Sequence, residues 1–191
     1  LANRFALNLF RPGVPFFRLD IARDTEAQLA EAGVKQADMR EVMVNAEQEG
    51  MRVMDREALR PSIVSAFEQL IILGNTLMNT EGELEFINIR NYVVRRALSG
   101  KVVEILTHYE LLVDELEDNV QAMLKGKRPD ETVHFVRHYL KEGKKWHLKQ
   151  YVDQIYVPDG DTTFNEAAFP LHPLTWRLAK GQHYGTGLVE D

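Results

Sequence analysis

A glycine-rich segment near the end of the sequence contains the residues whose spacing comes closest to a ligand site. Gly181, Gly185 and Gly187 precede what reads as the start of a helix, and backbone amides in such a turn can bind phosphate. However, the spacing does not fit the G-x-G-x-x-G fingerprint, and Leu174–Leu178 is not the long apolar strand that this fingerprint follows. We therefore keep binding of a nucleotide or small molecule by this turn as an alternative hypothesis.

Three histidines lie on a predicted β-hairpin and could begin a zinc site. If the two strands pair around Lys141–Lys144, His138 lies opposite His147, with His134 on the same face. A zinc site needs at least three protein ligands, and His134 and His138 lie about 13 Å apart at roughly 3.3 Å per residue of strand. The sequence therefore predicts no metal site, and these histidines are interpreted as exposed strand residues.

The same hairpin is locally basic in an acidic chain. A basic patch can bind nucleic acid or an acidic partner, but lysines at a hairpin tip also discourage pairing with strands of other molecules. We favour the second interpretation and keep a nucleic-acid-binding module as an alternative. The basic residues are Arg137, Lys141, Lys144, Lys145 and Lys149.

Other side chains capable of catalysis or ligand binding lack the partners that their chemistry needs. Residues 159–161 (Asp-Gly-Asp) match part of a calcium loop without its later glutamate, and they predict a plain turn. Ser62, Ser65 and Ser99 show no nucleophile elbow and no local His or Asp partner. The sequence thus contains no enzyme signature, and it predicts no catalytic residue and no cofactor.

The composition indicates a folded globular protein. Of the 191 residues, 45% are hydrophobic and 27% charged, which excludes a disordered chain and suits one domain with its own core. The absence of cysteine excludes disulfides and thiolate metal sites, and no run of about 18 apolar residues predicts a membrane span. The net charge of −6 argues against tight binding of nucleic acid, which selects clustered Lys and Arg.

An amphipathic helix at Pro61–Gly74 is the element around which the others are expected to pack. Its apolar residues recur at the spacing of a helix that buries one face. Pro61 suits the first turn, and Gly74 suits a left-handed C-cap. Strand-rich sequence follows at once, so we expect this helix to pack on a sheet. The apolar residues are Ile63, Ala66, Phe67, Leu70 and Ile71.

The remaining segments alternate between predicted helices and predicted antiparallel strands, with no internal repeat. The expected fold class is α+β, with helices packed on antiparallel strands and hairpins. Helices are predicted at Leu1–Arg11, at Thr25–Glu31, from Asp38 with Glu41 completing a capping box, and over 112–124. Strands are predicted at Val14–Ile21, Leu84–Ile89, Tyr92–Arg96, Lys101–Leu106, Thr132–Leu140 and Lys145–Val157.

Segments in one consistent order along the chain resemble the head-to-tail connecting, or portal, proteins of short-tailed, podovirus-type bacteriophages. The most specific is Pro170–Leu178 followed by Gly181–Asp191, which resembles the family pattern P-x-x-P-x-[RT]-[WM]-x-x-L and its glycine-tyrosine-glycine continuation. Since the segments are distributed from the first residue to the last, the resemblance extends over essentially the whole sequence. The others are Leu1–Ile21, Pro61–Asn75, Leu84–Leu106 and Asp130–Tyr139.

The resemblance implies a function that the residues alone do not. It implies a structural, non-enzymatic subunit of a twelve-membered ring at one vertex of a phage head, through which DNA is packaged and ejected. The implied partners are other copies of the chain, the major capsid protein, the terminase, the tail adaptor and internal core proteins. Double-stranded DNA would pass without sequence-specific binding, and no membrane is involved. The implied location is the portal vertex of the virion, after assembly in the bacterial host cytoplasm.

The resemblance also implies that residues 1–191 form one α+β segment of a longer portal chain. Since the sequence opens in a helical pattern and stops at what reads as a helix start, both ends are interpreted as cut. The segment would be the peripheral, wing-like region, with the stem, clip and crown mostly absent. Thr186 stands where the family often has Arg, so no role of that arginine is carried over. The family-motif turn, interpreted as structural, comprises Gly181, His183, Tyr184, Gly185, Gly187 and Glu190.

Overall fold

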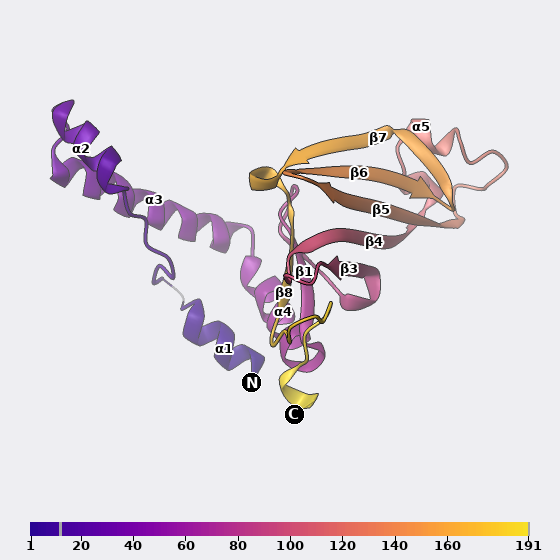
Figure 1. Ribbon diagram of the computed structural model, residues 1–191, viewed down its shortest axis with the longest axis horizontal. Helices are drawn as coiled ribbons and strands as arrows, with labels where there is room; N and C mark the ends of the chain where they lie inside the picture. Colours follow the sequence, from indigo (N-terminus) through magenta and orange to yellow (C-terminus); the bar gives the residue numbers. More distant parts are fainter. Residues whose placement is uncertain (12, 191) are drawn as a thin grey trace. The chain divides into compact units, whose positions relative to one another are not determined.

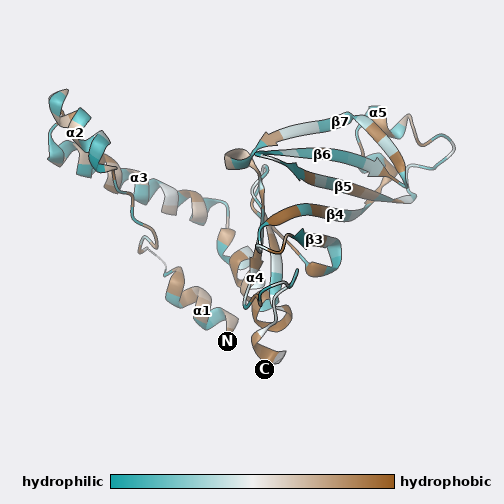
Figure 2. Cartoon of the chain, in the orientation of Figure 1, coloured by the Kyte–Doolittle hydropathy of each residue, from teal (hydrophilic) through white to brown (hydrophobic). Residues whose placement is uncertain are grey.

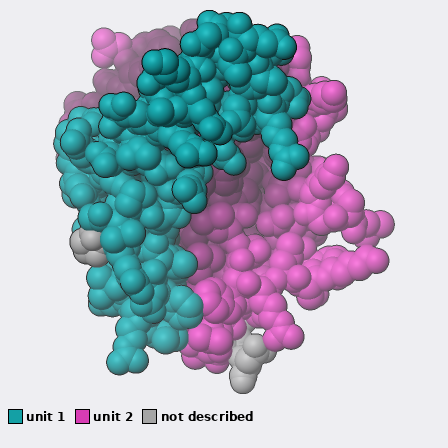
Figure 3. Space-filling view, turned by 90° about the vertical axis from the view of Figure 1, so that its left-hand side faces the viewer, with its two compact units in different colours: residues 1–68 teal, residues 69–191 magenta. Residues whose placement is uncertain are grey.

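The structure is a computed structural model that describes residues 1–11 and 13–190, except for the side chain of Glu190 (Figure 1). Two compact units divide the chain, Leu1–Glu68 and Gln69–Asp191, and Figure 3 shows them in separate colours. The predicted α+β class is confirmed, with helices and two antiparallel sheets. No helix of the described part is both long and apolar enough to cross a membrane.

The first unit is helical. Aromatic rings contribute to its packing: the Phe67 ring lies 6.3 Å from that of Phe5 and 6.2 Å from that of Phe10, between centroids. Figure 2 shows that the second helix is largely hydrophilic, whereas the fourth is hydrophobic along much of its length. The helices are α1 (Ala2–Leu9), α2 (Arg23–Glu31), α3 (Gln36–Arg56) and α4 (Leu59–Leu73), whose last residues belong to the second unit.

Helix α4 confirms the predicted central helix. Ile63, Ala66 and Ile71 are buried at the predicted spacing. Gly74 follows the helix with φ +72, and its N–H donates to the Leu70 carbonyl over 3.0 Å, so it is the left-handed C-cap residue that the sequence predicts. Among the described residues, neither hydrophobic cluster of the second unit contains an α4 side chain.

Two local predictions in the first unit are wrong. Residues 14–21 form no strand. The Phe17 ring lies against α3, because a Cβ built on Gly50 would be 2.8 Å from it, and Leu19 N donates to Glu47 Oε1 over 2.7 Å. The capping box at Asp38 is also wrong, since α3 begins at Gln36, two residues earlier, with no side-chain cap. For residues 14–21, contacts with α3 therefore take the place of the strand that the sequence pattern suggested.

The second unit contains two antiparallel sheets. A three-stranded sheet has the order β2-β1-β8, and a five-stranded meander has the order β3-β4-β5-β6-β7 (Figure 1). The strands predicted at Leu84–Ile89, Tyr92–Arg96 and Lys101–Leu106 therefore do not form one sheet: the first belongs to the three-stranded sheet and the other two to the five-stranded sheet. The strands are β1 (Asn75–Asn79), β2 (Glu85–Ile87), β3 (Tyr92–Arg96), β4 (Val102–Leu112), β5 (Thr132–Glu142), β6 (Lys145–Val152), β7 (Ile155–Asn165) and β8 (Leu171–Thr175).

One hydrophobic cluster joins the two sheets. It combines Leu77 and Leu171 of the small sheet with Ile105 of the large one. Phe169, just before β8, stacks on Trp146 of β6, with 4.0 Å between centroids and 5° between planes. Because these apolar side chains are removed from water together, the two sheets stabilise each other.

The helix predicted over 112–124 is mostly wrong. Strand β4 continues to Leu112, a 3₁₀ turn follows, and the only α-helical part is α5 (Asp118–Gln121). Nevertheless, Leu116, Val120 and Leu124 are buried, in a second cluster with strand residues such as Val133. The apolar spacing thus identified the buried side chains of a segment that packs on the sheet, but not its backbone conformation.

The long strand predicted at Lys145–Val157 is two strands. Asp153 and Gln154 both have positive φ, 45° and 71°, as a two-residue hairpin turn of type I′ requires, and β7 begins after them. Residues 159–161, predicted as a plain turn, lie inside β7 instead. There the register shifts: Leu148 pairs with Thr162, but Gln150 pairs with Val157, so β7 carries extra residues opposite β6 as in a bulge.

Protonation of Asp153 is expected to weaken the fold at acid pH. Its carboxylate accepts from Lys127 Nζ over 2.5 Å and from the backbone N of His134 over 2.9 Å, and both bonds keep the pKa of Asp153 below its ordinary value. A carboxyl whose pKa is lowered by folding contributes stability above its unfolded-state pKa of about 3.9, and that stability is lost as pH falls through the folded-state pKa. The free energy of unfolding should therefore decline below about pH 5.

Urea unfolding of Asp153→Asn at a series of pH values checks this expectation. Asparagine tolerates the left-handed turn position, so the variant removes mainly the charge, and its unfolding free energy should decline less on acidification. Asp159→Asn, at an exposed position, is the control and should decline as the unsubstituted chain does. Equal declines for Asp153→Asn and the unsubstituted chain would contradict the assigned role.

Candidate functional site

The candidate site is the glycine turn, residues 181–187, which follows β8. Gly181 has φ +84, a backbone conformation that glycine adopts without strain. An isolated antiparallel bridge then pairs Arg177 with Thr186, and Thr186 N donates to the Arg177 carbonyl over 2.9 Å. The turn is therefore closed on the segment that precedes it.

The side-chain amide of Asn75, the first residue of β1, fixes the turn to the end of α4. Its Nδ2 donates to the carbonyl oxygens of Leu73, over 2.8 Å, and Gly185, over 2.7 Å. Its Oδ1 accepts from Gly185 N over 2.7 Å. Asn75 is only 2% exposed, so these three bonds supply the partners that a buried amide requires.

Three glycines allow the turn and the end of α4 to approach backbone to backbone. A Cβ on Gly74 would lie 2.4 Å from the carbonyl carbon of Thr186, and one on Gly187 would lie 2.5 Å from the Ile72 oxygen. One on Gly185 would lie 2.7 Å from a backbone oxygen across the turn. Such distances exclude any side chain, so these positions require glycine for space.

Tyr184 and His183 supply acceptors to β3, which is an edge strand of the five-stranded sheet. Val94 N donates to the Tyr184 hydroxyl over 2.9 Å, and Arg96 N donates to His183 Nδ1 over 3.0 Å. The Tyr184 ring also packs against the cluster that joins the sheets, 6.4 Å from the ring of Tyr92 between centroids. The glycine turn thus connects α4, β1 and β3.

These contacts leave little capacity for an anion in the turn. The N–H groups of Gly185 and Thr186 already donate to protein oxygens, and the space beside Gly185 and Gly187 is filled by backbone. A phosphate cradle needs N–H groups directed at the ligand. The structure therefore brings the motif residues 183, 184, 185 and 187 into contact with other parts of the second unit, whereas Gly181 lies at an exposed turn position with open space beside it. The side chain of Glu190 lies outside the described residues.

The predicted opposition of His138 and His147 is wrong. Strand β5 ends at Glu142, which pairs with Lys145, so His138 lies opposite Lys149. His138 Nε2 is 2.7 Å from Glu104 Oε1 on β4, and His147 Nδ1 is 3.3 Å from the Thr163 hydroxyl. The error is a shift of register, which arises because the turn occupies only residues 143–144.

The basic hairpin is partly neutralised by acidic partners. Lys141 Nζ lies 2.5 Å from Glu166 Oε1, and Arg137 contacts Glu81 over 3.2 Å. The other three lysines are exposed, namely Lys144, Lys145 and Lys149. The exposed positive charge is therefore confined to the turn and β6, which is a small area for binding nucleic acid through its phosphates.

One group of side chains of metal-ligating type was not identified from the sequence. His108 and Glu110 of β4 lie beside His134 of β5, with one possible ligand atom from each within 4.8 Å of the others. His108 and Glu110 have the i, i+2 spacing that places side chains on one face of a strand. That signal was in the sequence, but finding it required the pairing of β4 with β5.

Comparisons with known proteins agree on one family for this chain. The sequence profile of the family described as "Bacteriophage head to tail connecting protein" matches residues 1–191. The chain is 28% identical over 201 aligned residues to a protein named "Portal protein" from Enterobacteria phage SP6, 27% identical to one from Pseudomonas phage phiKMV and 26% identical to one from Escherichia phage T7. Each match covers 100% of this chain, but only 39%, 39% and 38% of the respective relative.

Substitutions in the glycine turn are expected to destabilise the fold. Gly187→Ala forces the Ile72 carbonyl to move and should lower the free energy of unfolding by about 1–3 kcal/mol. Thr186→Ala, at the exposed neighbouring position, should stay within about 0.5 kcal/mol of the unsubstituted chain. Chemical unfolding measures both, and equal effects of the two variants would contradict the close contact.

Removal of the Asn75 amide tests the hydrogen bonds separately from the steric contact. Asn75→Ala removes three part-buried bonds to backbone groups of Leu73 and Gly185, and it should cost on the order of 3 kcal/mol. Asn88→Ala removes a single bond from an exposed cap and should cost about 1 kcal/mol or less. Similar losses in the two variants would show that the Asn75 bonds contribute no more than a surface cap.

Proposed function

Because the chain belongs to the family of bacteriophage head to tail connecting proteins, we propose that it is a structural subunit of a phage portal. In this role it helps form the ring through which DNA is packaged and ejected and to which the tail attaches. The observation that carries the proposal is the match of the family profile to residues 1–191. The relatives that share this match over the whole chain are named portal proteins.

We place residues 1–191 in the peripheral, wing-like region of a longer portal chain. The chain spans about two fifths of the length of the curated relatives it matches, and its α+β architecture suits a region that packs beside its neighbours. The stem, clip and crown would then lie mostly in other residues of the polypeptide. In this proposal the glycine turn is a structural element of the wing.

The proposed role is structural and not enzymatic. The turn and its partner Asn75 support this role because their polar groups are directed at the protein itself: Asn75, Tyr184 and His183 each bond to backbone groups. A catalytic site needs side chains within reach of a substrate atom. Here the same side chains fix a helix end and two strands in relation to one another.

The assembly we propose is a closed ring of twelve identical subunits in the virion, at the portal vertex, after assembly in the host cytoplasm. In such a ring each subunit contacts its neighbours through two different surfaces. The further partners would be the major capsid protein, the terminase, the tail adaptor and internal core proteins. The net charge of −6 suits a ring that passes double-stranded DNA without tight phosphate binding.

Electron microscopy of the full-length protein tests the proposed assembly. We expect closed rings with twelve-fold symmetry and a central channel. The Thr186→Ala variant, whose side chain is exposed, serves as a matched sample and should form the same rings. A protein that exists only as monomer or dimer at the concentrations used for imaging would overturn the proposal.

Binding to DNA distinguishes the portal from the alternative of a nucleic-acid-binding module. We expect only weak binding at physiological salt, unchanged by the double substitution Lys144→Glu and Lys145→Glu. Lys125→Glu with Arg128→Glu, both at exposed positions, reverses the same charge elsewhere and is the control. Tight, salt-dependent binding that only the first double variant loses would support the nucleic-acid-binding alternative instead.

A further inference from the structure

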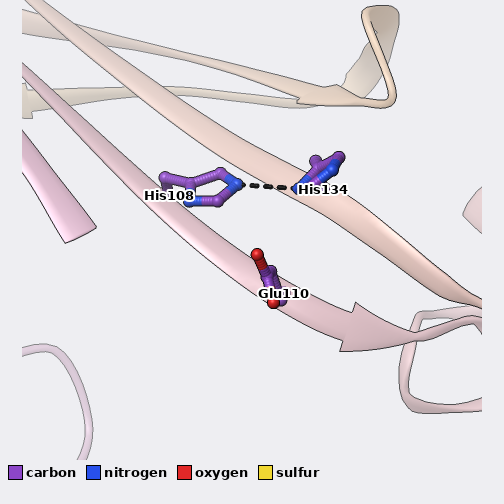
Figure 4. A group of neighbouring side chains, drawn as sticks. All are labelled: His108, Glu110 and His134. Atoms are coloured by element: carbon purple, nitrogen blue, oxygen red, sulfur yellow. Dashed lines mark hydrogen bonds between the residues drawn. The ribbon is translucent and has the colours of Figure 1, made fainter. Parts of the chain in front are cut away.

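The outer face of the five-stranded sheet carries two imidazoles and a carboxylate in register. His108 and Glu110 are two residues apart on β4, and Glu110 lies directly opposite His134 on β5. Residues two apart on a strand share a face, and Figure 4 shows the three side chains grouped beside the two strands. The opposite face carries the buried residues Ile105 and Tyr139, so the group lies on the polar side of the sheet.

Backbone pairing brings Glu110 and His134 especially close. The backbone N–H of His134 donates to the Asp153 carboxylate over 2.9 Å. The backbone carbonyl of His134 accepts from the N–H of Asp153, also over 2.9 Å. Both groups therefore point toward the turn after β6 and away from β4. Glu110 and His134 accordingly form a non-hydrogen-bonded pair of the β4–β5 ladder, the kind in which side chains lie closer together.

The distances suit coordination of one metal ion. His108 Nε2 and His134 Nδ1 are 3.0 Å apart. Two nitrogens that each lie 2.0–2.1 Å from zinc at a tetrahedral angle are roughly 3.3 Å apart, so a few tenths of an ångström separate the observed pair from a metal-bound one. A carboxylate oxygen of Glu110 is within 4.8 Å of both nitrogens, and its flexible side chain can supply the remaining movement.

The surroundings leave room for an ion and restrain the strand that carries His134. Glu110 and His134 are exposed, and His108 is half-buried, so an ion can enter from solvent and retain a water at a fourth position. Asp153 is in turn bound to Lys127 over 2.5 Å, which restrains the backbone from which His134 projects. Restraint of the backbone before an ion binds reduces the conformational entropy that binding costs.

We propose that His108, Glu110 and His134 form a binding site for a divalent transition metal of the zinc class. Two imidazoles and one carboxylate suit Zn²⁺, whereas Mg²⁺ and Ca²⁺ prefer sites made of oxygen ligands. The bound ion links β4 to β5 on the face opposite the core. This inference does not depend on the proposed portal function.

Titration of the intact protein with Zn²⁺ alone, followed by calorimetry, tests the site. We expect one ion per chain with no competition from Mg²⁺. His134→Gln, His108→Gln and Glu110→Gln should each weaken the affinity at least about tenfold. His172→Gln, an exposed histidine of β8, is the matched control and should bind as the unsubstituted protein does.

Two further readouts keep the outcome interpretable. Circular dichroism verifies that each variant is folded. A ligand that binds the folded state stabilises it, so Zn²⁺ should raise the melting temperature of the unsubstituted protein and of His172→Gln. The rise should be smaller for the three cluster variants. Absence of Zn²⁺ binding by the folded protein, or binding that all three cluster variants retain unchanged, would overturn the proposal.

Discussion

The close backbone contact between Gly74 and the glycine turn is the constraint on which the second unit depends. Helix α4 must end there in a left-handed residue, β1 must begin at the next position, and the turn must pass without a side chain in between. Asn75 completes the contact by bonding to Gly185, 110 residues away in sequence. Closing a loop of that length costs conformational entropy, which the shared core of the two sheets offsets. The contact also positions Tyr184 and His183, which belong to the same turn and accept hydrogen bonds from backbone N–H groups of β3.

The sequence predicted those parts of the fold in which local preference and tertiary packing agree. Helix α4 has both a helical apolar spacing and a terminal glycine, and it was predicted nearly to its ends. Residues 112–124 have the same kind of spacing, but there burial against β5 and β6 is achieved by an irregular segment. The turn at Asp153 was missed because Asp-Gln is a weak turn signal, whereas the bonds that the Asp153 side chain makes to His134 and Lys127 are tertiary. Neither outcome can be derived from periodicity, which reports burial more directly than it reports backbone conformation.

For the candidate sites, the sequence identifies the types of residue involved but does not determine the strand register that brings them together. The motif glycines could be identified from the sequence by family resemblance, yet their steric role depends on the opposing carbonyl groups of α4. The sequence predicts His134, His138 and His147 on one hairpin and therefore suggests these three as neighbours. The neighbours of His134 in space are instead on β4, across a strand pair whose register the sequence did not determine. A one-residue shift reverses every side chain of a strand to the other face, so such clusters become visible only once the pairing is known.

The two edges of the five-stranded sheet have a consequence for crowded assemblies of identical chains. An exposed strand edge is a template on which another molecule can add a strand, and uncontrolled addition leads to aggregation. At β3 the side chains of Tyr184 and His183 already occupy backbone donors, and at the far edge β7 contains Pro158 within its irregular register. Neither edge therefore offers a long, regular row of free backbone groups. Addition of a strand from another molecule to either edge of the five-stranded sheet is therefore disfavoured.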